Sequence, residues 1–214
     1  MQPIEAVIFD ADGTLVDSET PGLDVLHEQA LALGLDWQRE ALHERFRGVR
    51  MADCAARLAA EAGRHEPGFA DAFLLQLRAA MAERFRLGLA PMAGAEALLR
   101  RLALPFCVAT NGPREKVELT LGLTGLLPLL RDRIYSAYEV GSFKPEPGLF
   151  LHAAAALGVA PARCAVVEDS LPGVEAGLAA GMQVFTLLPR AQAPTALRQQ
   201  VVFIRELAEL ADHF

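Results

Sequence analysis

Four carboxylates stand at the ends of two short apolar runs in this sequence, where they could perform chemistry. Asp10 and Asp12 follow one run, and Glu168 and Asp169 close another. Residues two apart on an extended chain point to the same side, so Asp10 and Asp12 can share one face. Carboxylates held together repel unless one stays protonated or a cation joins them, and Mg²⁺ prefers such oxygen ligands. The pairs therefore predict a nucleophile beside an acid, or a magnesium site; a solvated turn and a helix cap are the structural alternatives.

A hydroxyl and a rare lysine add groups that could bind an anion. Thr110 and Asn111 follow a third apolar run, in a turn that opens a helix and so offers backbone N–H groups. Lys144 is one of two lysines among the twenty Lys and Arg residues, and flanking prolines stiffen its loop. A cation there could neutralise a phosphoryl oxygen. A plain helix cap and a solvated surface lysine are the competing interpretations.

The elements that must position these residues alternate between strand and helix. Short runs of apolar and β-branched residues are followed by stretches with helical spacing. Such alternation predicts an α/β fold with a doubly wound parallel sheet, covered by helices on both faces. Ligands of such sheets bind beyond the carboxyl ends of the strands, where the four carboxylates stand. The expected strands are 4–9, 106–109, 133–136, 164–167, 182–186 and 201–204, and the expected helices are 94–102, 114–121, 147–157, 171–180 and 205–211.

One long segment interrupts the alternation. From residue 18 to 89 no strand pattern occurs, and apolar residues recur at helical spacing. We interpret the segment 18–89 as an inserted all-helical domain, and residues 1–17 with 90–214 as one discontinuous α/β domain. Its apolar stripes are expected to pack as core: Leu23, Leu26, Ala30 and Leu33 form one, and Phe69, Phe73, Leu77, Met81 and Phe85 form another.

Composition narrows the classes of protein. The 214 residues are 52% hydrophobic, enough for a sizeable core, and carry a formal net charge of −7 with no basic run. Nucleic-acid binding needs a basic face and is not expected. No targeting segment or membrane span is apparent, and three scattered cysteines, expected to be buried free thiols, favour the reducing cytoplasm. A monomer is expected, because no exposed apolar helix stands out.

Four short motifs occur in an order that resembles a known superfamily. They are DADGTLVDSE at 10–19, Thr110-Asn111, Lys144-Pro145, and Glu168-Asp169-Ser170 followed by Gly173. Together they are similar to the four motifs of the haloacid dehalogenase superfamily, and the resemblance covers essentially the whole chain. It implies a Rossmann-like α/β core with a helical cap inserted between the first and second motifs.

The resemblance also implies a role for each motif residue. Asp10 would be the nucleophile that forms an aspartyl-phosphate. Asp12 would protonate the leaving alcohol and then activate the hydrolytic water. Thr110 and Asn111 would bind the phosphoryl group, and Lys144 would steady both that group and Asp10.

A magnesium site follows from the same resemblance. Mg²⁺ would be held by Asp10, the backbone carbonyl of Asp12, and Asp169, with Glu168 binding directly or through water. The metal would shield the nucleophile from the anionic substrate. The implied activity is a Mg²⁺-dependent phosphatase of small phosphorylated metabolites.

Other branches of the superfamily run other reactions, and the sequence argues against several. Dehalogenases lack the aspartate that stands here as Asp12, and phosphonate-cleaving relatives use a cap lysine, which 18–89 does not contain. β-Phosphoglucomutases are closer, but they carry a histidine where this chain has Gly22, and Thr14 is phosphatase-like. A sugar phosphate mutase remains the alternative. A non-catalytic protein that binds a phosphorylated effector is a third hypothesis, which the complete set of motifs argues against.

The cap segment suggests a substrate class. Together with other segments, RFRGVR at 45–50 is similar to that of bacterial phosphatases acting on 6-phosphogluconate. Arg47 and Arg50 flank a turn at Gly48 and could bind the carboxylate of a sugar acid; ordinary surface arginines are the alternative. We therefore expect a sugar or sugar-acid phosphate, such as 6-phosphogluconate, as the substrate.

Overall fold

The computed structural model describes residues 2–47, 49–130 and 132–213. The chain divides into two compact units, one of residues 1–17 and 90–214 and the other of residues 18–89. Among the residues described, none of the helices combines the length and the apolar character that crossing a bilayer requires.

The larger unit is built on a six-stranded sheet in which all neighbouring strands are parallel. Its strand order is β3-β2-β1-β4-β5-β6, which confirms the predicted doubly wound α/β fold. β1, β2 and β4 are buried along their whole length, which explains why they are continuous apolar runs in the sequence. The strands are β1 (Ala6–Phe9), β2 (Phe106–Thr110), β3 (Ile134–Ser136), β4 (Cys164–Glu168), β5 (Gln183–Thr186) and β6 (Val201–Phe203).

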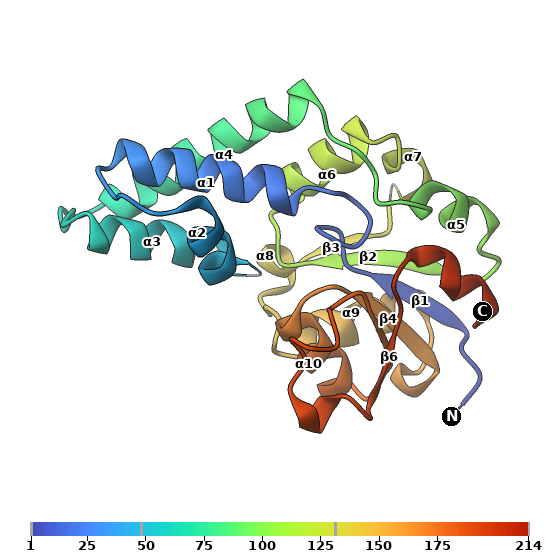
Figure 1. Cartoon of the computed structure of the whole chain (residues 1–214). Helices are drawn as coiled ribbons and strands as arrows, with labels where there is room; N and C mark the ends of the chain where they lie inside the picture. Colours follow the sequence, from blue (N-terminus) through green and yellow to red (C-terminus); the bar gives the residue numbers. More distant parts are fainter. Residues whose placement is uncertain (1, 48, 131, 214) are drawn as a thin grey trace. The chain divides into compact units, whose positions relative to one another are not determined.

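Helices cover both faces of this sheet. In Figure 1, α9 (Gly148–Leu157) and α10 (Leu171–Ala179) lie on one side of the sheet, and α5 (Ala95–Arg101) and α6 (Arg114–Leu123) lie on the other. Apolar side chains of α9 and α10, such as Phe150 and Val174, pack with Ile8 and Val166 of the sheet as one core. The remaining elements are α7 (Leu127–Leu130), α8 (Ala137–Val140) and 3₁₀ turns at Pro161–Arg163, Thr195–Leu197 and Leu207–Asp212.

Two local predictions for this unit were incomplete. The helix expected at 205–211 is a 3₁₀ helix at Leu207–Asp212, a tighter form that short terminal segments often adopt. The four-residue helices α7 and α8 were not expected, because four residues are too few to show a helical period.

The strand order brings distant chain segments to one edge of the sheet. β1 lies between β2 and β4, and Phe9 is level with Val108 of β2 and Val167 of β4. The Asp10 N–H donates a hydrogen bond to the Val167 carbonyl at 3.0 Å. The residues that follow β1, β2 and β4 therefore leave the sheet side by side at its carboxyl edge, where doubly wound sheets bind ligands.

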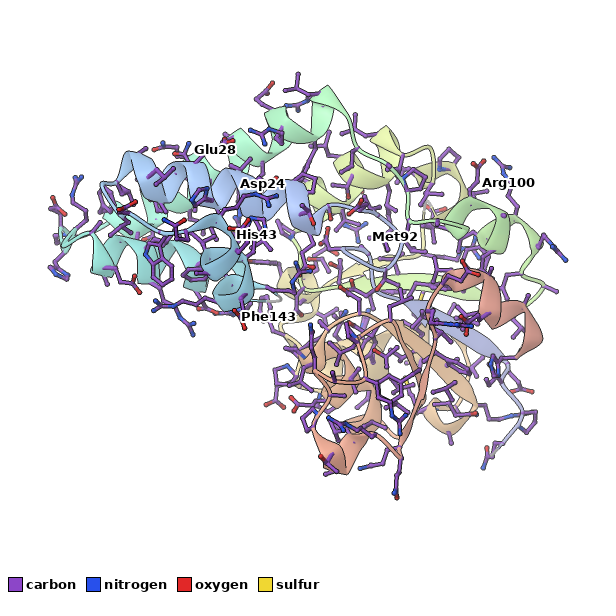
Figure 2. The ribbon with its side chains drawn as sticks, viewed as in Figure 1. Asp24, Glu28, His43, Met92, Arg100 and Phe143 are labelled. Carbon is purple, nitrogen blue, oxygen red and sulfur yellow. The ribbon has the colours of Figure 1, made fainter. Side chains whose placement is uncertain are left out.

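The described residues of the smaller unit form four helices and no strand. They are α1 (Glu19–Ala32), α2 (Arg39–Phe46), α3 (Met51–Glu61) and α4 (Phe69–Leu87). The stripe expected on α4 is buried from Phe73 to Phe85, together with Leu26 of α1, in a core of its own. Asp24 of α1 and His43 of α2 face each other in this unit (Figure 2), with 3.1 Å between Asp24 Oδ1 and His43 Nε2.

Candidate active site

A buried lysine joins two carboxylates at the carboxyl edge of the sheet. The Lys144 Nζ donates to Asp10 Oδ1 at 2.5 Å and to Glu168 Oε1 at 2.6 Å. Only 5% of Lys144 and 7% of Asp10 are exposed, and Glu168 is fully buried. The sequence-predicted residues Asp10, Lys144 and Glu168 thus meet in one cluster, although 134 positions separate Asp10 from Lys144.

Burial and the shared ammonium set the protonation of this cluster. Burial raises the pKa of Asp10 to about 7, although the attraction of Lys144 opposes this rise. Burial works against the charge of Lys144, but Asp10 and Glu168 outweigh it and raise the pKa of that ammonium. Lys144 therefore stays cationic at neutral pH, and its single charge faces more than one carboxylate.

Asn111 fixes the backbone of Lys144. Its Oδ1 accepts from the Lys144 N–H at 2.9 Å, and its Nδ2 donates to the Lys144 carbonyl at 3.2 Å. Both side-chain groups of Asn111 are thus engaged with the backbone of one residue of the neighbouring loop. This positioning contact was not foreseen from the sequence, which predicts that Asn111 binds the phosphoryl group; that contact stays a prediction.

Glu168 is held by a cradle of donors at the start of α10. Its Oε2 accepts from the Asp169 and Ser170 N–H groups, each at 3.0 Å, and from the Ser170 hydroxyl at 2.9 Å. Gly173 makes room for this arrangement, because a Cβ added there would lie 1.8 Å from the Glu168 carboxyl carbon. The conspicuous glycine three residues after Ser170 is therefore part of the site.

Asp169 contacts the turn that follows β1. The Thr14 hydroxyl donates to Asp169 Oδ1 at 3.2 Å. Gly13 has a φ of +79°, and a Cβ added there would lie 2.1 Å from Asp169 Oδ2. Only glycine fits both the backbone conformation and this close approach. The turn after β1 and the turn after β4 are thereby packed onto each other.

The carboxylates of Asp10, Glu168 and Asp169 fit a hard divalent cation. One ligand oxygen from each lies within 4.8 Å of the others. Three clustered acids with one ammonium leave excess negative charge, which an Mg²⁺-like ion would balance with its preferred oxygen ligands. The donor set therefore matches the kind of metal that the sequence predicts.

Thr110 ends β2 beside this cluster. It is buried, and its Oγ1 accepts a hydrogen bond from the Gly112 N–H at 3.0 Å. This bond shapes the turn that leads into α6. The hydroxyl thus lies at the edge where the phosphoryl group is expected, and its contact with that group stays a prediction.

The second lysine of the chain also reaches this edge. Lys116, in the first turn of α6, forms an ion pair with Asp12 Oδ1. Neither side chain is fully buried. The pairing of Lys116 with Asp12 was not predicted. The scarcity of lysine in the sequence was a signal that could have drawn attention to Lys116 as well as to Lys144.

The predicted cap residues belong to the helical unit. Arg47 forms an ion pair with Glu19. The Arg50 guanidinium donates to both carboxylate oxygens of Asp53, at 2.9 and 3.0 Å. Gly48 lies outside the described residues. Binding of a substrate carboxylate by Arg47 and Arg50 stays a prediction.

Comparisons with known proteins give the family. The model of the haloacid dehalogenase-like hydrolase family matches residues 4–181. The 6-phosphogluconate phosphatase of Escherichia coli is 36% identical over 186 residues, which are 86% of this chain and 83% of that protein. A HAD family hydrolase from Deinococcus radiodurans, solved with bound phosphate and sodium, is 34% identical with a TM-score of 0.74, over 97% of this chain and 93% of that one. CbbY from Rhodobacter sphaeroides, solved with phosphate, is 26% identical with a TM-score of 0.74, over 97% of this chain and 96% of that one. The chain therefore belongs to the haloacid dehalogenase-like hydrolase family.

Proposed function

We propose that this phosphatase of the haloacid dehalogenase-like family hydrolyses a small sugar phosphate or sugar-acid phosphate, such as 6-phosphogluconate, with Mg²⁺ and through an aspartyl-phosphate at Asp10. The observation that carries the proposal is the buried cluster in which Lys144 binds both Asp10 and Glu168 at the carboxyl edge of the sheet. A buried carboxylate held by a point cation is a nucleophile that can approach an anionic phosphoryl group.

The first half-reaction transfers the phosphoryl group to the protein. An oxygen of Asp10 forms a bond to phosphorus, and the bond between phosphorus and the leaving oxygen breaks with its electrons. Asp12 gives a proton to that oxygen, so the product leaves as an alcohol. Lys144, with its backbone fixed by Asn111, offsets negative charge on the phosphoryl oxygens, and the Thr110 hydroxyl donates to one of them.

The second half-reaction returns Asp10 to its starting state. Water attacks phosphorus, the bond to Asp10 breaks, and Asp12 takes the water proton. Phosphate is then the second product. The same residue thus serves as acid and as base, which its place two residues after the nucleophile supports.

The proposed metal ligands are two carboxylates of this cluster and one backbone carbonyl. Asp10, Asp169 and the backbone carbonyl of Asp12 would hold Mg²⁺. Glu168 would act through water, because both of its oxygens already accept hydrogen bonds from Lys144, Ser170 and the peptide of Asp169. When bound, Mg²⁺ would offset the charge between the nucleophile and the phosphoryl oxygens.

The proposed substrate class rests on a relative and on the cap arginines. The Escherichia coli relative is named 6-phosphogluconate phosphatase, and Arg47 and Arg50 offer planar forks that suit a sugar-acid carboxylate. Both arginines bind carboxylates of the helical unit in this structure, so a substrate carboxylate would replace those partners.

The proposed compartment is the cytoplasm. Cys54, Cys107 and Cys164 are buried free thiols, as expected of a protein that works where thiols stay reduced. Burial raises the pKa of Cys54 to about 12 and that of Cys164 to about 11, which keeps these thiols unreactive.

The test is phosphate release from a panel of phosphorylated metabolites in the presence of Mg²⁺. The panel contains 6-phosphogluconate, phosphoglycolate, hexose 6-phosphates and β-glucose 1-phosphate. We expect kcat/KM to be highest for a sugar-acid phosphate, and Asp10→Asn to lower kcat by at least about 10³-fold with the fold intact. Conversion of β-glucose 1-phosphate to glucose 6-phosphate without phosphate release would instead identify a mutase.

A further inference from the structure

Each aspartate at the end of β1 has its own lysine. Lys144 binds Asp10, and Lys116 binds Asp12. All the other residues among the twenty Lys and Arg of the chain are arginines. Lysine carries a compact charge on a flexible stem, whereas arginine carries a planar fork. Both lysines of an arginine-rich chain thus stand where a point cation meets carboxylates of the proposed site.

Helix stability does not account for Lys116. It lies in the first turn of α6, where the helix dipole favours acidic side chains over basic ones. Its stem passes close to the turn after β2, since a Cβ added to Gly112 would lie 3.5 Å from Lys116 Cδ. The side chain therefore crosses from α6 over this turn to reach Asp12 in the turn after β1. The ion pair with Asp12 therefore accounts for a lysine at position 116.

The two lysine pairs differ in burial. The side chain of Lys144 is 3% exposed, whereas the side chains of Lys116 and Asp12 are 30% and 27% exposed. The side chains of Asp12 and Lys116 are therefore accessible to water, whereas that of Lys144 is almost inaccessible. This difference suits a carboxylate that must meet a hydrolytic water while its orientation is held by a neighbour.

We propose that Lys116 is a positioning residue, which binds Asp12 Oδ1 and so holds the Asp12 carboxylate where it takes the proton of the hydrolytic water. The inference rests on the proposed function. In that step the water oxygen bonds to phosphorus, the bond from phosphorus to Asp10 breaks with its electron pair returning to Asp10, and the proton passes to Asp12. Lys116 acts through Asp12 and is assigned no contact with the water or the phosphoryl group.

The variant Lys116→Met, assayed with p-nitrophenyl phosphate, tests this role. The p-nitrophenolate group leaves without a proton, so transfer to Asp10 proceeds without help from Asp12, whereas hydrolysis of the phosphoenzyme needs it. We expect kcat to fall by about 10- to 100-fold and KM to fall with it, so that kcat/KM changes by less than about twofold. A burst of p-nitrophenol, close to one per active site, should precede the slow steady state. Lys116→Arg, which keeps a cation at this place, should recover most of kcat.

Arg100→Met is the matched control. Arg100 lies on α5 of the same unit (Figure 2), where it forms an exposed ion pair with Glu96. Its replacement removes this ion pair and should leave both the burst and kcat as in the wild type. Rapid quench of the phosphoenzyme compares its decay rate constant directly in the wild type and in Lys116→Met. An unchanged decay rate constant would overturn the proposal. So would a loss of kcat/KM that shows no burst and that Lys116→Arg does not recover. Failure of the proposed function looks different, because Asp10→Asn would then keep its turnover.

Discussion

The balance of charge around Lys144 is the central feature at the scale of single residues. The Lys144 ammonium binds Asp10 and Glu168. Asp169 adds a third carboxylate, and one oxygen from each of the three carboxylates lies within 4.8 Å of the others. A buried charge without a partner is costly, so this group of acids is stabilised when a divalent cation joins it. The site therefore couples metal binding to the stability of the protein, which gives a test that needs no substrate.

Saturating Mg²⁺ should raise the free energy of unfolding, by about 2.7 kcal/mol at a hundred times the Kd. Asp169→Asn removes one carboxylate and should cut this stabilisation to less than about half. Urea unfolding of the apo protein, with and without Mg²⁺, measures both values. Asp71→Asn, on α4 of the other unit, serves as the control and should respond as the wild type does. A wild type that is equally stable with and without Mg²⁺ would contradict the proposed metal site.

At the scale of elements, the turns after β1 and β4 depend on two glycines. Gly13 lets Asp169 approach the first turn, and Gly173 leaves the space that the Glu168 carboxyl group fills at the start of α10. The resemblance marked Gly173 as a motif residue, but the sequence does not state what the missing side chain makes room for. The close approach of Asp169 to Gly13 is likewise not stated by the sequence, because it appears only once the strands bring positions 13 and 169 together.

Gly173→Ala should therefore disrupt the site. The new Cβ would overlap Glu168, so we expect the free energy of unfolding to fall by about 2–4 kcal/mol. We expect the fractional loss of kcat to be larger than the fractional loss of the free energy of unfolding. Gly122→Ala in α6 is the matched control, because a Cβ there meets nothing closer than 3.9 Å. It should stabilise the protein by about 0.5–1 kcal/mol through helix propensity. Urea unfolding compares both variants, and equal effects would show that crowding at Glu168 is not the cause.

The pairing of α1 with α2 should respond to pH. His43 Nε2 is buried and lies 3.1 Å from Asp24 Oδ1 without making a hydrogen bond. Burial lowers the pKa of His43 from 6.5, and the charge of Arg39 adds to this effect. Below pH 6.5 the His43 imidazole binds a proton in the unfolded chain more readily than in the folded protein. The free energy of unfolding therefore falls as the pH drops from 6.5 toward the lower pKa of His43 in the folded protein.

Removing the imidazole should flatten this response. We expect the loss of stability between about pH 7.5 and pH 5.5 to be smaller in His43→Gln than in the wild type, as measured by urea unfolding. His65→Gln replaces an exposed histidine of the same unit and should keep the wild-type slope. Parallel slopes for all three proteins would exclude His43 as a source of acid sensitivity.

At the scale of the whole molecule, the sequence predicts the main architecture and misses contacts made by tertiary packing. Runs such as 164–167 predict buried parallel strands because the strands are apolar on both faces. The pair of Lys116 with Asp12 could not be predicted, since it depends on how α6 packs beside the turn after β1. The hydrogen bonds of Asn111 with the Lys144 backbone could not be predicted for the same reason.

We expect residues of the helical unit to select the substrate. If Arg47 and Arg50 bind the carboxylate of a sugar acid, replacing either by Met should raise KM for 6-phosphogluconate by about 10-fold or more, since a charged hydrogen bond contributes about 1.5–3 kcal/mol. KM for p-nitrophenyl phosphate, which has no carboxylate, should change by less than about twofold. Arg45→Met, which removes an ion pair with Glu61 in the same unit, is the control and should affect neither substrate. Equal increases on both substrates would assign Arg47 and Arg50 to the structure of the helical unit, where they bind Glu19 and Asp53, rather than to recognition of the substrate.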